Sequence, residues 1–353
     1  MQIPHIPQPP RGDTVTWHSG LDASHQPSYP HRAFTRSSRT LVMLSHPAQS
    51  PLDTLTATDV DEWAELHAPH WNLNYEQLSS GRFEARKEVR HDAQGVIYRE
   101  SVSQNIRIQG ELSEDSIAFG LFNEAGTLGK FWGNRLPPNG IAYSTDLGDV
   151  DVTYQTGTLG ILAIVPRSVF QRFYTALDGL NPHFLETPNG VAEISEASRA
   201  RLSKVWNSLL DAQMAGPQNR HLTSIVITET CEALRGPGSR LIEPCARRPL
   251  FQRAVDLADS NDHPLSIPEI CLELRVSQRT LENVFQTQVG ISPRRYLNLR
   301  RMNKAYLLLK RGNPEDDSVT KIATSCGFTE LGRFAVSFRK HFGISPSERL
   351  RRR

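Results

Sequence analysis

Cysteine is scarce in this sequence of 353 residues, and the four copies are far apart. They stand at Cys231, Cys245, Cys271 and Cys326, and no two of them form a C-x-x-C pair. Disulfide frameworks and zinc knuckles need repeated or closely spaced cysteines. The sequence therefore argues against both kinds of structure.

Long apolar runs are also lacking. No run approaches the roughly 18 residues that a helix needs to cross a bilayer, and the amino terminus has no basic region followed by an apolar one. We therefore expect a cytoplasmic protein that has no membrane partner.

Common catalytic motifs are a third absence. The sequence contains no G-x-S-x-G elbow, no Gly-rich phosphate loop and no H-E-x-x-H. A metal-dependent cupin enzyme, the main alternative, would need several histidines and a carboxylate on adjacent strands. Only His91 lies near a predicted strand, while His67 and His70 flank Pro69 and cannot share a helix face. We expect no enzymatic activity, no metal and no cofactor, and stoichiometric bound iron, zinc or manganese would revive the alternative.

Charge is present but unevenly distributed. Residues 247–353 carry 20 Lys and Arg against 11 Asp and Glu, a net charge of +9, which leaves −7 for residues 1–246. A basic third of this kind favours a polyanion partner, although a solvated charged face remains the alternative until a reading motif is found.

The first part of the chain has the pattern of a disordered tail followed by a β-rich domain. Residues 1–38 are dominated by Pro, His, Ser, Arg and Gln. Short runs of β-branched and aromatic residues then alternate with Gly and Asn turns, which is typical of a roll or barrel. The predicted strands cover residues 41–44, 83–89, 96–101, 105–108, 117–122, 140–144, 150–154 and 158–164.

Helical spacing appears at residues 59–67 and again after Pro166, at residues 168–177, 194–214 and 222–234. The run from Gly236 to Ser239 interrupts this pattern and begins a predicted linker over residues 236–248.

A repeat organises the remainder of the chain. The sequence Gly-Ile-Ser-Pro occurs at Gly290 and again at Gly343, and Phe285 has its counterpart at Phe338. Each copy reads as a short helix, a tight turn and a longer helix, which predicts two helix-turn-helix units, at residues 266–288 and 318–342.

Serine and threonine mark the predicted helix starts in both units. The four helices of the two units are each preceded by a predicted N-cap: Ser266, Ser277, Ser318 and Thr329. A longer helix over residues 293–310 joins the units and would let both meet successive major grooves, about 34 Å apart. The predicted core residues of the second helices are Leu281, Phe285, Phe334 and Phe338.

The predicted fold class is therefore α+β with two domains. Residues 39–235 form an amino-terminal β-roll or barrel, cupin-like, with trailing helices. Residues 249–353 form a carboxyl-terminal all-α domain with the two helix-turn-helix units.

Residues 250–350 resemble the DNA-binding domain of the AraC/XylS family of bacterial transcription regulators. The second copy carries the family signature, here Ile322-Ala323, Cys326-Gly327-Phe328, Arg333-Phe334, Phe338-Arg339-Lys340-His341-Phe342 and Gly343-Ile344-Ser345-Pro346. Gly332 departs from the pattern, because many members carry a larger residue there. The first unit is therefore expected to supply more of the direct base readout.

The resemblance implies two sets of DNA-contacting residues. Base-reading positions fall on Arg279, Glu282, Asn283, Leu331, Gly332, Arg333 and Val336, and phosphate contacts on Thr280, Arg294, Arg339 and Lys340. Arg can donate two hydrogen bonds to guanine, Glu can accept one from cytosine, and Asn can hydrogen-bond adenine. For each of the polar residues, the alternative is that it is an ordinary exposed side chain.

The amino-terminal region resembles regulators of the ethanolamine-utilisation type in two short stretches, residues 75–83 and Tyr98-Arg99-Glu100. The wider family implies a sensing and dimerisation barrel. A barrel of about eight strands can enclose one small molecule. We expect an effector pocket near Phe83, Phe119, Phe131 and Trp132, with plain core packing as the alternative.

The expected function is that of a DNA-binding regulator, an activator, that responds to a small-molecule effector. The expected partners are double-stranded DNA, the effector, RNA polymerase and a second copy of the chain. An effector-independent regulator whose first domain serves only dimerisation or protein contact remains open.

Overall fold

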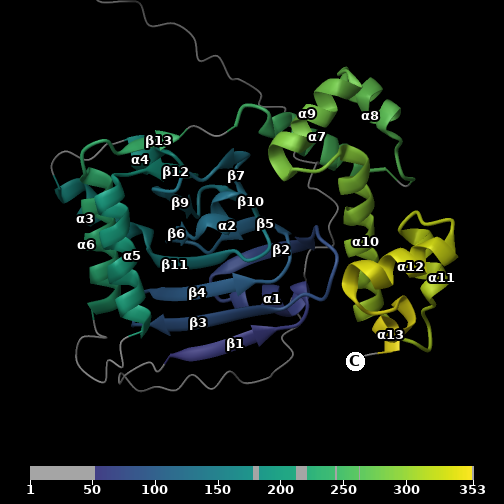
Figure 1. Ribbon diagram of the computed structural model, residues 1–353, viewed down its shortest axis with the longest axis horizontal. Coiled ribbons are helices and arrows are strands. Elements are labelled where there is room, and N and C mark those ends of the chain that lie inside the picture. Colours follow the sequence, from purple (N-terminus) through teal and green to yellow (C-terminus); the bar gives the residue numbers. More distant parts are fainter. Residues whose placement is uncertain (1–51, 178–182, 212–220, 243–244, 262, 352–353) are drawn as a thin grey trace, which may run out of the picture. The chain divides into compact units, whose positions relative to one another are not determined.

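Two antiparallel sheets and a set of helices make up the described part of the chain (Figure 1). The computed structural model describes residues 52–177, 183–211, 221–242, 245–261 and 263–351. The predicted tail over residues 1–38 and the predicted strand at 41–44 lie outside these ranges. Residues 38–353 cluster as one unit.

The larger sheet has eight strands and the smaller sheet has five. The larger sheet contains, in spatial order, β1 (Asp53–Ala57), β3 (Ala85–His91), β4 (Val96–Val102), β11 (Leu159–Pro166), β6 (Ser116–Phe122), β9 (Gly140–Thr145), β12 (Asn189–Glu193) and β13 (Arg240–Ile242). The smaller sheet contains β2 (Trp71–Gln77), β5 (Ile106–Leu112), β10 (Asp149–Tyr154), β7 (Lys130–Phe131) and β8 (Asn134–Arg135).

Both faces of the central strands of the larger sheet are covered. Successive side chains on a strand point to opposite faces, so Tyr98 packs in the core between the sheets while its neighbour Ile97 packs in a second core. That second core also contains Trp206 and Val226 from the helices. Figure 1 shows these helices together against one face of the sheet: α3 (Arg167–Ala176), α5 (Glu196–Asp211) and α6 (Leu222–Arg235).

Several predicted elements of this region are confirmed. The predicted helix is α1 (Val60–His67), capped by Asp59, whose side chain accepts from the backbone of Asp61 and Glu62. Seven of the predicted strands appear as β3, β4, β5, β6, β9, β10 and β11, with shifted ends. Short helices also form at α2 (Glu124–Thr127) and α4 (His183–Glu186).

Other strands were not predicted. In β2, Trp71, Leu73 and Tyr75 alternate with polar residues as in a half-buried strand. β13 lies inside the segment predicted as a linker, because residues 240–242 pair with β12 and extend the sheet. The short strands β1, β7, β8 and β12 were also missed.

The helical region contains the two predicted helix-turn-helix units. Its helices are α7 (Arg248–Asp259), α8 (Ile267–Leu274), α9 (Gln278–Val289), α10 (Pro293–Arg311), α11 (Val319–Ser325), α12 (Leu331–Phe342) and α13 (Pro346–Arg351). None of the described helices is both long and apolar enough to cross a membrane.

Local cap chemistry explains several of the helix ends. Ser266 and Glu269 form a reciprocal capping box at α8, and Ser277 and Ser318 accept backbone hydrogen bonds at α9 and α11. Gly290 ends α9 with φ of 73°, a left-handed conformation that glycine adopts at little energetic cost. The prediction that Thr329 caps α12 was wrong, because Glu330 occupies that position and its side chain makes no cap hydrogen bond.

Each unit has its own aromatic core. In the first, Phe285 and Tyr296 pack with Phe251 of α7, with ring centroids 4.8 to 5.6 Å apart. In the second, Phe334 and Phe338 pack with Phe342 and other aromatic rings. These contacts hold each second helix so that its opposite face remains exposed.

The chain between β2 and β3 touches both units. Leu78 is buried in the core of the first unit. Gly81 donates its backbone N–H to the carbonyl of His341 at 2.9 Å, in the second unit. The His341 ring is buried, with Nε2 3.1 Å from the Gln77 carbonyl and Nδ1 3.4 Å from Ser80 Oγ.

Phe338→Ala should lower the free energy of unfolding by about 3 to 5 kcal/mol, because the side chain is fully buried and its removal leaves a cavity. Val336 lies two residues earlier on the same helix and is 72% exposed, so Val336→Ala should stay within about 0.5 kcal/mol. Urea unfolding followed by circular dichroism of the helices measures both. Similar losses for the two variants would contradict the assignment of the helix faces.

Stability should also fall in mild acid through His341. Burial lowers its pKa below the ordinary value of 6.5, the hydrogen bond to Gln77 opposes this shift, and Arg295 adds to it. The unfolded chain thus takes up the proton more readily, so the stabilisation is complete above pH 6.5 and is lost as the pH falls below that value. Between about pH 7.5 and about pH 5.5, the wild type should lose more unfolding free energy than His341→Gln, which cannot titrate. If urea unfolding shows that the wild type and His341→Gln lose the same unfolding free energy between these two pH values, His341 does not contribute to the loss.

Candidate nucleic-acid interface and barrel cavity

The outer face of α9 carries the predicted base-reading residues of the first unit. Arg279, Glu282 and Asn283 are all exposed, while Leu281 and Phe285 are buried on the opposite face. Arg279 and Asn283 are four residues apart and therefore lie next to each other on the helix surface. The structure thus presents one guanidinium and one amide together to solvent.

Two other polar residues of α9 are engaged within the helix. Gln278 Nε2 donates to Glu282 Oε1 at 2.9 Å. The hydroxyls of Thr280 and Ser277 lie 2.9 Å apart at the cap. An outside hydrogen-bond partner would have to compete with these contacts.

The exposed face of α12 has fewer polar groups. Arg333 is exposed and forms an ion pair with Glu330 at 2.9 Å, while Val336 is apolar and open space surrounds Gly332. Leu331 packs partly against the core of the second unit. Of the predicted base-reading residues of this unit, Arg333 is the charged one.

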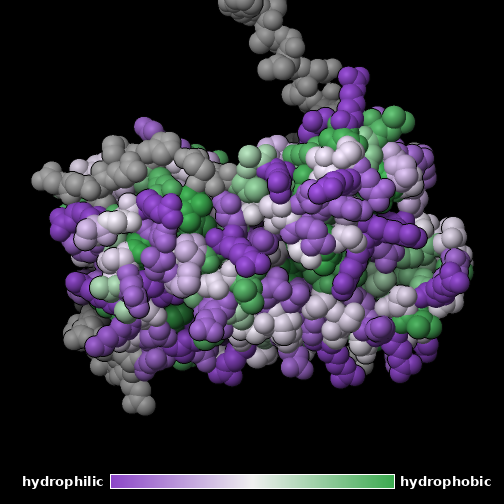
Figure 2. Space-filling model, turned by 45° about the horizontal axis from the view of Figure 1, so that its top comes forward, coloured by the Kyte–Doolittle hydropathy of each residue, from purple (hydrophilic) through white to green (hydrophobic). Residues whose placement is uncertain are grey.

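The predicted phosphate-contacting residues lie around these faces. Arg294, Arg339 and Lys340 are exposed, as is Thr280 at the start of α9. Figure 2 shows hydrophilic residues over much of the visible surface, with smaller hydrophobic patches between them. Whether the four residues contact phosphates stays a prediction.

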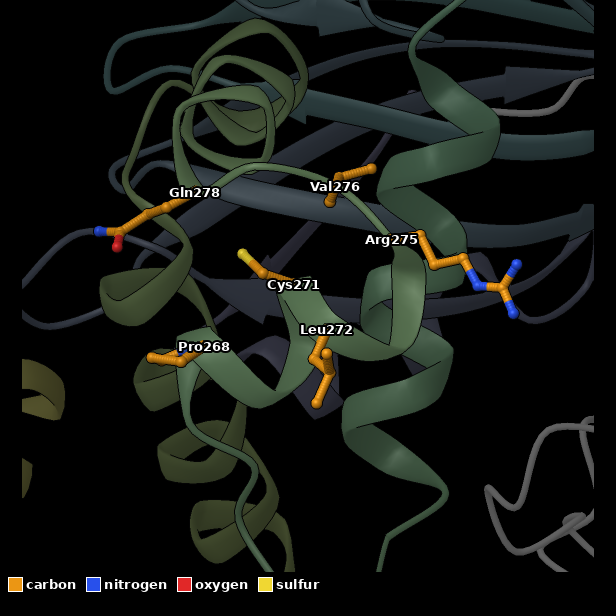
Figure 3. Close-up of a pocket in the computed structure, with 6 residues that line it drawn as sticks. All are labelled: Pro268, Cys271, Leu272, Arg275, Val276 and Gln278. Carbon is orange, nitrogen blue, oxygen red and sulfur yellow. The ribbon is translucent and has the colours of Figure 1, made fainter.

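A surface hollow of about 470 Å³ lies on the first unit, around α8 and the following turn. Its lining includes Cys271 and Leu272, and the Leu272 side chain is 76% exposed. Figure 3 shows the polar ends of Arg275 and Gln278 pointing away from each other. The hollow therefore lacks the convergent polar groups that fix the orientation of a small ligand.

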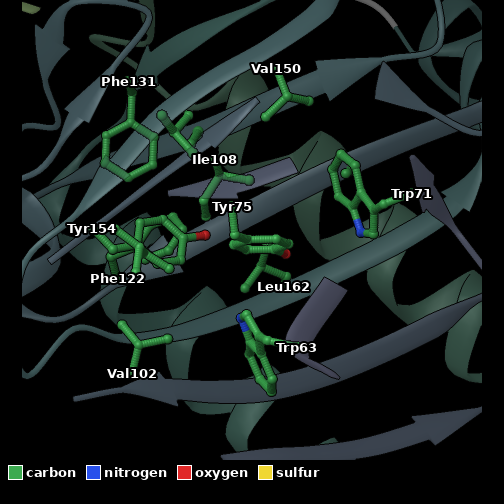
Figure 4. Close-up of a cluster of buried hydrophobic side chains, with 14 of the residues drawn as sticks. Trp63, Trp71, Tyr75, Val102, Ile108, Phe122, Phe131, Val150, Tyr154 and Leu162 are labelled. Atoms are coloured by element: carbon green, nitrogen blue, oxygen red, sulfur yellow. The ribbon is translucent and has the colours of Figure 1, made fainter. Parts of the chain in front are cut away.

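A second cavity, of about 60 Å³, lies between the two sheets. Aromatic side chains form much of its wall, and Figure 4 shows Tyr75 in the middle of this cluster. The residues that line it are His67, Trp71, Leu73, Tyr75, Tyr98, Glu100, Ile108, Ala118, Phe119, Gly120, Phe122, Phe131, Trp132, Ala142, Tyr143, Ser144, Val150, Val152, Tyr154 and Leu162.

Polar groups meet at one part of this cavity. Glu100 Oε2 lies 3.0 Å from His67 Nε2, and the Tyr154 hydroxyl also hydrogen-bonds Glu100. Lys87 lies beside them, with Nζ 4.0 Å from the centroid of the Tyr98 ring. Burial lowers the pKa of Lys87 to about 8, and Glu100 opposes that shift. A basic and an acidic side chain therefore lie close together beside the cavity.

Ser144 is a buried polar residue of the cavity wall that is not satisfied. Its side-chain oxygen has no hydrogen-bond partner within the described ranges, and the residue is only 5% exposed. Leaving a buried hydroxyl unpaired costs about 1 to 3 kcal/mol. A bound molecule that hydrogen-bonds Ser144 would remove this penalty.

Three of the four residues predicted to surround an effector line this cavity: Phe119, Phe131 and Trp132. Phe83 is buried in the same core but is not part of the lining. Their contact with an effector stays a prediction. Glu100 and Ser144 were missed, although Tyr98-Arg99-Glu100 shows the period-two alternation that places Tyr98 and Glu100 on one strand face.

A buried polar stripe on α10 was also missed. Tyr296, Arg300 and Asn303 recur at spacings of four and three residues, so they share one helix face. Arg300 contacts Glu76 of β2 at 2.5 Å and Asp259 of α7 at 2.6 Å. The spacing is visible in the sequence, but the carboxylate partners are not.

No group of three or more His, Cys, Asp or Glu among the described residues is arranged to hold a metal ion.

Residues 270–352 match the helix-turn-helix domain family. The chain is 34% identical over 164 residues to the "Probable thc operon regulatory protein" of Rhodococcus erythropolis, covering 42% of this chain and 49% of that protein. The chain thus spans about half the length of that relative. Among solved structures, the chain is similar to a transcriptional regulator from Chromobacterium violaceum, described as an AraC-type DNA-binding domain-containing protein. The two are 35% identical, the match covers 29% of this chain and 90% of that chain, and the TM-score is 0.27.

The XylDLEGF operon transcriptional activator 2 of Pseudomonas putida is matched over most of its length. The two are 30% identical over 133 residues, which cover 37% of this chain and 83% of that protein. Together with the paired helix-turn-helix units, this match shows that the chain belongs to the AraC/XylS family of transcription regulators.

Proposed function

We propose that the chain is a sequence-specific DNA-binding transcription regulator, an activator, that works in the cytoplasm as a homodimer and with RNA polymerase. The observation that carries this proposal is the pair of exposed reading faces on α9 and α12, joined by one helix. That helix, α10, has 19 residues, and at about 1.5 Å per residue it spans about 28 Å. This length is comparable to the spacing of about 34 Å between successive major grooves.

Base readout is divided unequally in this proposal. Arg279 and Asn283 of the first unit read guanine and adenine, and Glu282 accepts from cytosine after it releases Gln278. In the second unit Arg333 reads a base, and Val336 offers an apolar contact to a thymine methyl group. Thr280, Arg294, Arg339 and Lys340 hold phosphates.

The test begins with selection of preferred sequences from a random duplex library. Arg279→Ala should then remove the preference at one base pair, at a loss of about 1 to 3 kcal/mol, because its fork of donors is lost. Lys340→Ala should weaken the selected and the random duplexes alike and reduce the salt dependence. Fluorescence anisotropy measures both effects.

Two results would argue against this assignment. Equal losses on selected and random DNA for Arg279→Ala would contradict direct readout. If selection yields no common sequence, the proposal of a sequence-specific regulator fails.

We further propose that the cavity between the sheets binds the effector, and that the effector is small and uncharged. A water needs about 10 to 15 Å³ of such space, so about 60 Å³ holds a handful of heavy atoms. Glu100 would repel an anion and Lys87 a cation, whereas a hydroxyl can donate to Glu100. A second hydroxyl would satisfy Ser144.

Thermal unfolding with three probes of similar size tests this class: propane-1,2-diol, propionate and propylammonium. The diol should raise the melting temperature most, because a ligand that binds only the folded state stabilises it. Ser144→Ala should reduce that rise while the ligand-free protein stays folded. A larger rise with either ion would contradict the proposed class, and no rise with any probe would favour the effector-independent alternative.

A further inference from the structure

The two helix-turn-helix units differ at one matched position of their turns. The repeat aligns residues 275–277 of the first unit with residues 327–329 of the second, so Arg275 corresponds to Gly327. We propose that an arginine beside each turn binds a DNA phosphate: Arg275 in the first unit and Arg301 of α10 in the second. This inference rests on the proposed function, since it adds backbone contacts to the same DNA interface.

Both matched residues have a left-handed backbone. Arg275 ends α8 with φ of 55° and ψ of 44°, and Gly327 has φ of 79°. Glycine adopts this conformation at little cost, whereas an arginine there is strained, because its Cβ crowds the backbone. Strained residues of this kind cluster at functional sites. The first unit thus keeps a side chain where glycine would fit better, which points to a use for that side chain.

The Arg275 side chain has no such use within the fold. It is exposed, and it makes no hydrogen bond or ion pair with any residue in the described ranges. Figure 3 shows its guanidinium pointing away from Gln278, at the start of α9. All of its donors are therefore available to an outside anion.

In the second unit, the turn itself has no room for an arginine. A Cβ atom on Gly327 would lie 2.3 Å from Cγ of Pro264, which is too close for any side chain unless the chain shifts. The same Cβ atom would lie 3.6 Å from Nη1 of Arg301. The guanidinium of Arg301 thus lies next to the place where a side chain at position 327 would begin. Each turn has a guanidinium beside it, although the two come from different elements.

Arg301 is held at this place without an acidic partner. Its Cζ lies 5.7 Å from the centroid of the Phe328 ring, within the range of a cation–π contact. Burial lowers its pKa below the usual value, and Cys326 opposes that shift. Arg301 is half-buried, yet it forms no ion pair in the described part of the chain, and its Nε is enclosed without a hydrogen bond. The adjacent Arg300, by contrast, is paired with two carboxylates. Arg301 therefore lacks an anion, and a ligand can supply it.

The position of the turns points to DNA phosphate as this anion. Each turn leads directly into a reading helix, since α9 begins at Gln278 and α12 at Leu331. A reading helix in the major groove is flanked by the phosphates of both strands, so a guanidinium near the start of the helix lies beside them. Arginine can donate two parallel hydrogen bonds to one phosphate. Because successive grooves repeat about every 34 Å, one arginine per unit makes the same contact twice.

The two arginines supply what the reading faces do not share. Phosphate contacts fix the register and orientation of a protein on DNA but carry no sequence information. The polar face of α9 and the less polar face of α12 are thereby given one common contact each. Removing either arginine should weaken binding to any duplex and leave the preferred sequence unchanged.

The experiment removes each guanidinium singly in the full chain. Arg275→Gly also relieves the left-handed strain, so its melting temperature should stay level or rise while DNA binding falls. Arg301→Met removes the charge and keeps a long side chain against Phe328. Arg172→Ala is the matched control, because it removes the same charge from an exposed residue of α3, outside the helix-turn-helix units. Fluorescence anisotropy at several salt concentrations gives dissociation constants for the selected duplex and for a random duplex.

Both turn variants, Arg275→Gly and Arg301→Met, should bind the two duplexes at least about 3-fold more weakly than the wild type, by similar factors on each duplex. Each should reduce the slope of log K against log salt by about 0.9, the value of one phosphate contact. The double variant should reduce it by about 1.8, because distant contacts add. Arg172→Ala should stay within about 1.5-fold of the wild type, as expected for a screened surface charge.

Three results would overturn the proposal. The first is wild-type affinity and salt slope in a folded turn variant. The second is a loss confined to the selected duplex, because the arginine would then read a base. The third is an equal loss in Arg172→Ala, because general electrostatics would then explain the effect.

A lower melting temperature of Arg301→Met would mix stability with binding, and Arg301→Lys separates the two. Lysine keeps the positive charge beside Phe328, so this variant should retain the salt slope of the wild type. A slope reduced by about 0.9 in folded Arg301→Lys would contradict the phosphate contact.

Failure of this inference and failure of the proposed function look different. If the wild type selects a sequence but the turn variants keep its affinity and salt slope, the turn contacts fail and the function stands. If the wild type selects no sequence, the proposed function fails, and the random duplex still shows whether the turn variants lose a phosphate contact.

Discussion

Buried charge needs partners, and this requirement organises the contacts around α10. Arg107 and Arg300 lie out of solvent, and burial alone would lower the pKa of Arg107, but Asp151 and Tyr296 hold it above its ordinary value. Removing one member of such a set costs about 3 to 5 kcal/mol, because an uncompensated ion stays behind. The strands β2, β5 and β10 and the helices α7 and α10, which supply these groups, therefore cannot be altered independently.

Side-chain alternation along the strands also places the cavity and the ionic contacts around α10 on opposite faces of the same strands. A strand has two faces, and in β2 and β5 one face meets the cavity while the next residue along meets α10. The Tyr75 and Ile108 side chains need apolar surroundings, whereas Glu76 and Arg107 need ionic partners. A one-residue slip of register would exchange these environments, so the network also fixes the register of the cavity wall.

The helix-turn-helix units could be predicted from the sequence because their determinants are local. Ser266, Ser277 and Ser318 lie next to the helices that they cap, and apolar spacing of four identified Phe285 and Phe338 as core. Glu330 replaced Thr329 as the cap of α12, a shift of one residue that cap preferences alone do not resolve. The cavity was partly predicted, since Phe119, Phe131 and Trp132 line it. Its polar residue Glu100 and the ionic contacts of Glu76 were not predictable, because their partners lie dozens to hundreds of residues away in the chain.

The two units, which were predicted to differ in base readout, differ in what their second helices expose. Both second helices are held by an aromatic core, but α9 offers an exposed amide and guanidinium side by side, whereas on α12 Arg333 is paired with Glu330 beside the bare Gly332. For Arg333 to reach a base it must leave that exposed ion pair, which costs little, about 0 to 1 kcal/mol. The second unit thus combines a guanidinium that can exchange its partner at little cost with a fixed end at His341, whose carbonyl accepts hydrogen bonds from Gln77 and Gly81.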